Sequence, residues 1–255
     1  MILSSGTKKP KIHPSAYVAP SATVSGDVTI EADCAVLHGA VLSSEGAPVL
    51  LGTSSVVMEN AVLKASGGKA MQFPLRIGAR CIVGPGAYVV GATVAAGCFI
   101  AAGAKVFNGA TMAEGTSVAL GGIVHVRTHL ASGQHVPMQH VAFGDPATIY
   151  PPDRAGEVRE RLGFFETVFN IPQSDDVRAK AASAYAAFLR ASHAQDAIVD
   201  DGLRKAAPKP PPRKHEEPPP TQVAEVDKVV DVMFFELQEM ERRRKESIER
   251  GKKPH

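Results

Sequence analysis

The stretch VGPGAYVVGATVA, residues 83–95, places aliphatic side chains at Val83, Val89 and Val94, with glycine and alanine between them. The steps of six and five residues match neither the period of about 3.6 residues that a helix needs nor the alternation of about two residues of an ordinary strand. They are typical of a hexapeptide solenoid, in which each unit is a short strand followed by a tight corner.

The same spacing extends in both directions from this stretch, with two interruptions, the second of them ASGGKAMQFPLR at 65–76. Three hexads close one triangular coil, and each coil depends on its neighbours for stability. We therefore predict an all-β solenoid, a left-handed parallel β-helix of hexapeptide repeats, over residues 1–150, followed by C-terminal α-helices. The inward aliphatic positions are Ile12, Val18, Val24, Ile30, Val36, Leu51, Val57, Leu63, Ile77, Val83, Val89, Val94, Ile100, Val106, Met112 and Val118.

The chain changes character after residue 141, where VAFGDPATIYPPDR forms a Gly/Pro-rich exit from the repeat. Residues 151–200 are predicted to form two helices that pack on the outside of the solenoid, with Ser174 capping the second. A proline-rich charged linker follows over 201–222. Residues 223–255 are predicted to form an amphipathic helix with a basic end.

The apolar residues of this last helix alternate by three and four, which is the spacing of a coiled-coil seam. They are Val223, Val226, Val230, Met233, Leu237 and Met240. The apolar run is short for a self-sufficient coiled coil. Three interpretations therefore stay open for residues 223–250: a helix lying on its own oligomer, a helix that zips three chains together, or one that docks a protein partner.

The chain has 255 residues, of which 44% are hydrophobic, and a formal net charge of +2. This near balance gives no overall attraction to nucleic acid or to a membrane. The N-terminal residues contain no apolar run long enough for a signal peptide, so we expect a cytoplasmic protein. Cys34, Cys81 and Cys98 form no CxxC pair and are expected to be small buried side chains.

Three segments of the solenoid resemble the γ-class carbonic anhydrases, a family of left-handed β-helix proteins. LGTSSVVMENAVLK at 51–64 is similar to the family's IGxxTNIQDGxVIH segment, and residues 83–95 are similar to VGHxxxLHGCxIG, including the five-residue step. GDPA at 144–147 is similar to the GSPA-type exit loop. The resemblance implies a homotrimer in which three histidines bind zinc, or a similar divalent metal, between subunits.

The resemblance places the three metal-binding histidines at Lys64, Pro85 and Val90. Proline and valine carry no side-chain donor, and a lysine is mostly an ammonium ion at neutral pH, which repels a dication. We therefore expect no metal site, no bound cofactor and no ordinary carbonic anhydrase activity. The full set of cleft positions that the resemblance marks is His38, Ala40, Met58, Glu59, Lys64, Pro85 and Val90.

Two classes of function follow. The first is a binding or scaffold protein, in which Lys64 pairs with Glu59 near His38 and so satisfies two charges without a metal. The second is an acyltransferase that uses acetyl-coenzyme A and a histidine as general base, because hexapeptide proteins commonly have this activity.

The histidine-rich segment 125–140 supplies the candidate bases. These are His125, His129 and His140, with His135 in the same run. On one strand, His125 and His129 would share a face because their separation is even. No carboxylate or cysteine accompanies the histidines at ligand spacing, so we do not expect them to form a metal site.

Two loop features complete the sequence analysis. Residues 65–75 are either a mobile flap over a neighbouring subunit's cleft or a tolerated loop of the solenoid. Asn108 is expected at a corner, because asparagine tolerates left-handed backbone geometry.

Overall fold

The computed structural model describes residues 1–67, 71–160, 171–172 and 174–199. The chain divides into two units, residues 1–207 and 208–255. The predicted linker at 201–222 and the predicted helix at 223–255 lie outside the described residues, and both stay predictions.

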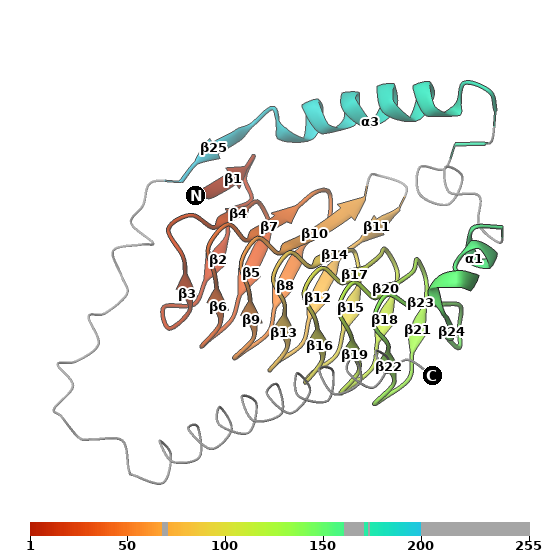
Figure 1. Ribbon diagram of the computed structural model, residues 1–255. Helices are drawn as coiled ribbons and strands as arrows, with labels where there is room; N and C mark the ends of the chain where they lie inside the picture. The colour runs from red at the N-terminus through yellow and green to blue at the C-terminus, as the bar shows by residue number, and fades with distance from the viewer. Residues whose placement is uncertain (68–70, 161–170, 173, 200–255) are drawn as a thin grey trace, which may run out of the picture. The chain divides into compact units, whose positions relative to one another are not determined.

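The first unit is a parallel β-helix, which confirms the predicted fold class (Figure 1). Its strands form three sheets, named A, B and C here. Sheet A contains β1 (Ile2–Ser5), β4 (Thr23–Ser25), β7 (Val41–Ser44), β10 (Val62–Gly67), β14 (Tyr88–Val90), β17 (Lys105–Val106), β20 (Ile123–Val124) and β23 (Val141–Phe143), all parallel. Three further strands join sheet A in antiparallel pairings: β24 (Thr148–Tyr150) with β23, β25 (Asp196–Ile198) with β1, and β11 (Gln72–Phe73) with β10.

The other two sheets contain seven parallel strands each. Sheet B contains β2 (Lys11–Ile12), β5 (Val28–Ile30), β8 (Val49–Leu51), β12 (Leu75–Ile77), β15 (Thr93–Val94), β18 (Thr111–Met112) and β21 (His129–Leu130). Sheet C contains β3 (Tyr17–Val18), β6 (Ala35–Val36), β9 (Val56–Val57), β13 (Ile82–Val83), β16 (Phe99–Ile100), β19 (Ser117–Val118) and β22 (His135–Val136). The chain visits sheets B, C and A in turn, so each coil contributes one strand to every sheet.

The core is the stack of inward aliphatic side chains that the period of six predicted. From Val24 to Val118, every one of the predicted inward positions is at most 2% exposed. Ile12 and Val18, in the first strands of sheets B and C, are half-buried because no further coil covers them. Stacking therefore accounts for the burial, one layer at a time.

The corners between sheets A and B need a left-handed backbone, and Gly91 and Gly109 supply it with φ of 53° and 73°. A Cβ on Gly91 would lie 2.5 Å from the Cβ of Phe73, so glycine is needed there for packing as well. The expected left-handed geometry of Asn108 is wrong, because the next residue takes it. The side chain of Asn108 instead accepts a hydrogen bond from Ser66 Oγ at 3.0 Å.

The described parts of the insertion, residues 65–67 and 71–75, pack on the chain's own solenoid. Strand β11 pairs with the end of β10, with Phe73 opposite Ser66. The Cβ of Phe73 lies against Gly91 and its ring against Gly109, neither of which has a side chain to oppose it. Of the two interpretations of this segment, the structure favours a loop held on its own chain; residues 68–70 lie outside the described residues.

The region after the solenoid contains η1 (Pro152–Arg154), α1 (Gly156–Glu160) and α3 (Val177–His193). The second predicted helix ends earlier than expected, because residues 196–198 form strand β25 on the open edge of β1. An unpaired strand edge offers free backbone groups that recruit such a strand. The predicted Ser174 cap is also wrong: Asp176 is the N-cap, and Ser174 Oγ donates to its carboxylate at 2.8 Å.

The three cysteines are buried, as expected, and none forms a disulfide. The thiols of Cys34 and Cys81 donate to the carbonyls of Gly52 and Ala95, each at 3.1 Å. Their role is thus to fill a corner and satisfy a carbonyl of the next coil. None of the described helices has the length and apolar character needed to span a bilayer.

Candidate functional site

Lys64 points outward from sheet A. Its neighbour Leu63 is fully buried in the core, and successive strand residues face opposite sides. In the parallel register, Lys64 lies between Ser43 of β7 and Val90 of β14. The structure therefore brings Lys64 and Val90, two of the three positions marked by the resemblance, together in adjacent coils.

The ammonium group of Lys64 is held by two partners. Its Nζ lies 2.7 Å from Oε1 of Glu45 and donates to the hydroxyl of Tyr185 at 3.1 Å. The side chains of Lys64 and Glu45 are only 17% and 9% exposed. Glu45 follows β7, whereas Tyr185 comes from α3. We call Glu45, Lys64 and Tyr185 the Lys64 cluster.

Two opposing effects set the pKa of Lys64. Burial acts to lower it, but the hydrogen bonds to Glu45 and Tyr185 raise it, and the net pKa lies above the ordinary value. Lys64 therefore carries its full charge at neutral pH. The pKa of Lys64 is higher in the folded chain than in the unfolded chain, so the contacts of its ammonium group stabilise the fold. This stabilisation is fully present below a pH of about 10.5 and is lost as the pH rises through the folded pKa.

An aromatic row continues along the outward side of sheet A from Tyr88, which neighbours the Lys64 cluster. Burial raises the pKa of Tyr88, although the charge of Lys64 acts in the other direction. The ring centroids are 6.2 Å apart from Tyr88 to Phe107, 6.0 Å from Phe107 to His125 and 5.7 Å from His125 to Phe143. These separations are those of favourable aromatic pairs.

The predicted partner of Lys64 is not the one that the structure gives: Lys64 pairs with Glu45, not with Glu59. Glu59 lies at the corner that leads from sheet C into β10, where its carbonyl accepts the N–H of Gly86 at 2.9 Å. Glu45 lies at the far end of the preceding strand of sheet A, the end at which Lys64 also lies. Sequence reasoning missed both Glu45 and Tyr185, because nothing in either local sequence marks it as a partner of Lys64.

The remaining cleft positions gather at the corners from sheet C to sheet A. His38 is exposed there, and its Nδ1 lies 2.9 Å from Ser21 Oγ. Met58 and Glu59 follow β9, and Pro85, which is exposed, follows β13, the next strand of sheet C. Ala40 is fully buried before β7. Within one chain, therefore, Pro85 lies at the start of a sheet A strand, whereas Lys64 and Val90 lie towards the other end.

The four histidines of residues 125–140 do not form one site. His125 follows β20 in sheet A, His129 begins β21 in sheet B, and His135 begins β22 in sheet C. The expectation that His125 and His129 share a face is therefore wrong, because the chain turns a corner between them. His140 lies at the next corner, before β23.

Hydrogen bonding fixes the tautomer of two of these rings. Nδ1 of His125 accepts the N–H of Val126 at 2.9 Å, so the neutral ring carries its proton on Nε2 and has no free lone pair. Nδ1 of His140 lies 2.8 Å from the carbonyl of Met138, so it must donate, and Nε2 keeps a free lone pair. Of these two, only His140 has the tautomer that a general base needs.

The residues at the family's metal positions do not fit zinc. A zinc site needs three or four donors with lone pairs, and here an ammonium already paired to a carboxylate stands beside an isopropyl group. Within residues 1–67, 71–160, 171–172 and 174–199, no group of three His, Cys, Asp or Glu side chains is placed to hold a metal.

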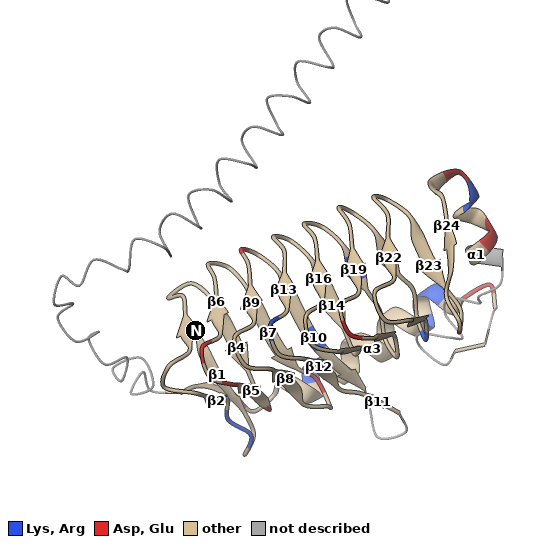
Figure 2. Ribbon diagram, turned by 90° about the horizontal axis from the view of Figure 1, so that it is seen from below, with Lys and Arg blue, Asp and Glu red and all other residues tan. Residues whose placement is uncertain are grey.

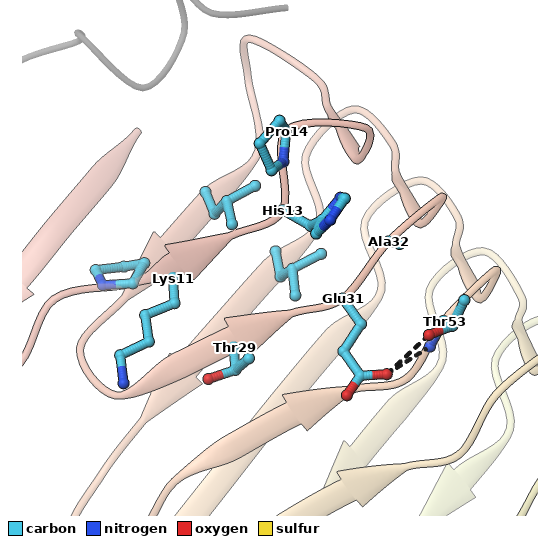
Figure 3. A pocket seen from close by; sticks show the side chains of 10 residues that line it. Lys11, His13, Pro14, Thr29, Glu31, Ala32 and Thr53 are labelled. Atoms are coloured by element: carbon cyan, nitrogen blue, oxygen red, sulfur yellow. Dashed lines mark hydrogen bonds between the residues drawn. The ribbon is translucent and has the colours of Figure 1, made fainter.

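A separate recess of about 740 Å³ lies at the first strands of sheet B (Figure 3). Its polar side chains are Lys11, His13, Thr29, Glu31 and Thr53. One oxygen of Glu31 already accepts the N–H and hydroxyl of Thr53, at 3.0 and 2.9 Å. Figure 3 shows Lys11 pointing away from His13, so these groups do not converge on one ligand position.

Comparison with known proteins supports the resemblance for half of the chain. The chain is 30% identical over 131 residues to the mitochondrial γ carbonic anhydrase 2 of Arabidopsis thaliana, covering 50% of this chain and 46% of the relative. The mitochondrial γ carbonic anhydrase 1 of the same plant is 31% identical, with 50% and 47% covered. The chain resembles the γ-class carbonic anhydrases.

This γ-carbonic-anhydrase-like chain spans about half the length of the curated relatives it matches. A further relative, an uncharacterized protein of Dictyostelium discoideum, is 27% identical over 131 residues, covering 51% of this chain and 53% of the relative. No protein-family model matches the chain.

Two solved structures overlap with larger shares of the γ-carbonic-anhydrase-like chain. They are a putative acetyltransferase of Bacillus cereus (TM-score 0.43, 21% identity, 76% of this chain and 98% of the other) and LpxA of Acinetobacter baumannii (TM-score 0.36, 14% identity, 74% and 96%). At these scores the similarity carries no inference about activity.

His125 makes the stability depend on pH in a defined direction. Burial lowers its pKa, so the unfolded chain takes up a proton more readily, and stability falls as the pH drops below about 6.5. We expect His125→Phe, which keeps a ring in the aromatic row, to flatten the dependence of melting temperature on pH between about 7 and 5. His129→Phe, at an exposed ring, is the control and should leave the slope unchanged. An identical slope in wild type and His125→Phe would contradict the assignment.

Proposed function

We propose that the chain is a non-catalytic, γ-carbonic-anhydrase-like trimer that acts as a binding or scaffold protein. The observation that carries this proposal is the Lys64 cluster, which places an ion pair at a position where the family has a metal-binding histidine. A dication at this position would meet the ammonium of Lys64. Without a bound metal, water at this cleft keeps its high pKa and no hydroxide forms to attack carbon dioxide.

The outward side of sheet C, which lacks charged side chains, supports a homotrimer. Its outward residues, one from each strand in register, include no Asp, Glu, Lys or Arg (Figure 2). Ile82 and Phe99 are 42% and 46% exposed there, and Leu120 and Met138 are 48% and 56% exposed at the adjoining corners. Exposed large apolar side chains on a side without charged residues mark an interaction surface. A second copy of the same chain is the occupant that the family resemblance suggests.

The zinc content of the purified chain tests the proposal directly. Protein produced in zinc- and cobalt-supplemented medium is expected to hold less than about 0.1 metal per chain by inductively coupled plasma mass spectrometry, because two of the three donor positions have no lone pair. A γ-class carbonic anhydrase carried through the same purification is the control. Metal near one per chain would overturn the non-catalytic assignment.

Phe99→Asp tests the trimer interface. A carboxylate at this position would be buried unpaired in the interface, so we expect the mass measured by light scattering to fall from about three times 26.8 kDa towards a single chain. Thr93→Asp, at an exposed strand position of sheet B, is the matched control and should remain trimeric. A monomeric wild-type chain would contradict the trimer without bearing on the absence of metal.

An acyltransferase that uses acetyl-coenzyme A is the second candidate, because the bond from His140 Nδ1 to Met138 leaves Nε2 free to take a proton from an acceptor hydroxyl or amine. If this activity exists, millimolar acetyl-coenzyme A should raise the melting temperature, and His140→Ala, unlike His129→Ala, should remove acetyl transfer. No shift in the wild-type chain would remove this candidate.

Two features of the proposed protein stay predictions. The sequence favours a cytoplasmic location, whereas the two named plant relatives are mitochondrial. A protein partner for residues 223–250 is an expectation from the sequence alone.

A further inference from the structure

The C-terminal arm, defined as α3 and β25 with the residues that join and follow them (177–199), lies against the outward side of sheet A (Figure 1). It covers Lys64, because Tyr185 of α3 accepts a hydrogen bond from Nζ and the ring centroid lies 5.9 Å from that atom. The arm thus lies over the part of the sheet that carries the Lys64 cluster.

The apolar contact between the arm and the solenoid is thin. Of the 17 residues of α3, only Val177 and Ala181 are buried, and neither belongs to the core cluster of the solenoid. Ile198 of β25 is 73% exposed, and Val199, which follows it, is the arm residue that packs, partly buried, against the core cluster. From β4 to β10, in contrast, each solenoid strand fully buries at least one aliphatic side chain in the central stack. Removing the arm therefore exposes little apolar surface.

Most of the contacts between the arm and the solenoid are polar. Strand β25 pairs with β1 over three residues, and the N–H of Val199 donates to the carbonyl of Ile2 at 2.9 Å. Ser4 Oγ and Ser5 Oγ donate to the carbonyls of Ala197 and Ser192 at 3.3 and 3.4 Å, which are long bonds. Nε2 of His193 lies 3.8 Å from Glu45. Water can replace each of these contacts when the arm leaves.

The carboxylate of Asp196 gains hydrogen bonds to water when the arm is open. Oδ1 of Asp196 is buried and has no hydrogen-bond partner among the described residues, although Oδ2 pairs with Nδ1 of His193 at 2.8 Å. A buried carboxylate oxygen without a partner has lost its hydration and gained nothing in return. On opening, water hydrates it.

The solenoid keeps its own charges balanced without the arm. The ion pair between Glu45 and Lys64 joins two solenoid residues, so it remains when Tyr185 and His193 depart. Backbone bonds between coils, such as the N–H of Val62 to the carbonyl of Ala87 at 2.8 Å, do not involve the arm. The contact that the core loses on opening is the one with Val199.

From these contacts we propose that the arm is a strap that opens and closes as a unit on the folded solenoid and controls access to the sheet face bearing Lys64. Closure places Tyr185 on the ammonium of Lys64 and pairs β25 with β1. Opening exposes the Lys64–Glu45 ion pair and the free edge of β1. The opening is a property of the fold, and it holds whether or not the cleft binds a ligand.

Native-state hydrogen exchange on the full-length chain tests the strap. The amide of Val199 reports on the arm, and the amides of Val62 and Tyr88 report on the solenoid. We expect the arm amide to be protected at least about 100-fold less than the solenoid amides, because local opening needs less free energy than global unfolding. Equal protection of the two sets would overturn the proposal.

Two variants sharpen the test. Tyr185→Phe removes only the hydroxyl that meets Lys64, so arm exchange should rise about five- to tenfold while solenoid exchange stays constant. Thr93→Val, which removes an exposed hydroxyl from sheet B, is the matched control and should change neither. An equal rise at the arm and the solenoid in Tyr185→Phe, or no rise at the arm, would overturn the strap.

A disulfide between β1 and β25 should hold the arm closed on the solenoid. Leu3 of β1 and Ile198 of β25 are opposite each other in the antiparallel register, where paired side chains come close enough to be bridged. In Leu3→Cys/Ile198→Cys, oxidation should slow exchange at Val199 towards that of the solenoid, and reduction should restore fast exchange. Fast exchange at Val199 with the disulfide formed would contradict opening at this pairing.

Discussion

Backbone hydrogen bonding between successive coils is the constraint on which the rest of this structure depends. A strand of two or three residues is too short to be stable alone, and its N–H and C=O groups are satisfied only by the coil before and the coil after. The same side-chain position therefore recurs every coil, and one aliphatic residue per hexad is enough to build a continuous core. Aromatic residues make up only 5% of the chain, because stacked valines and isoleucines fill the narrow interior.

Because the inward residues form the core, residues at the outward positions can be exchanged without disturbing it. Leu63 and Val89 hold the core from inside β10 and β14, while Lys64 and Val90 occupy the outward positions next to them. Exchanging a histidine for lysine or valine at an outward position disturbs no inward layer. The fold does not depend on a metal site at these positions, and the ion pair with Glu45 accommodates the charge of Lys64.

The arm and the solenoid are held by different interactions. Inside the solenoid, apolar layers and ladder hydrogen bonds reinforce one another. The arm relies instead on a three-residue pairing at the edge of β1, on hydroxyl contacts, on the Lys64 cluster and on a single partly buried apolar residue, Val199, packed on the core. Such contacts exchange readily with water, whereas burial in the stack does not. This contrast is the basis of the proposal that the arm opens while the solenoid stays folded.

The sequence by itself determined the parallel β-helix and the inward positions from Val24 to Val118, because both depend on the local period. The positions Pro85 and Val90 came from the family resemblance, and the chemistry of proline and valine then excludes them as zinc donors. The sequence did not identify Glu45 or Tyr185 as the partners of Lys64, and it assigned residues 196–198 to a helix. Those features depend on which coil lies beside which and on the open edge of β1, and such neighbours are far apart in the chain. The tautomers of His125 and His140 were likewise decided only by the carbonyl and N–H groups that the folded corners bring to each ring.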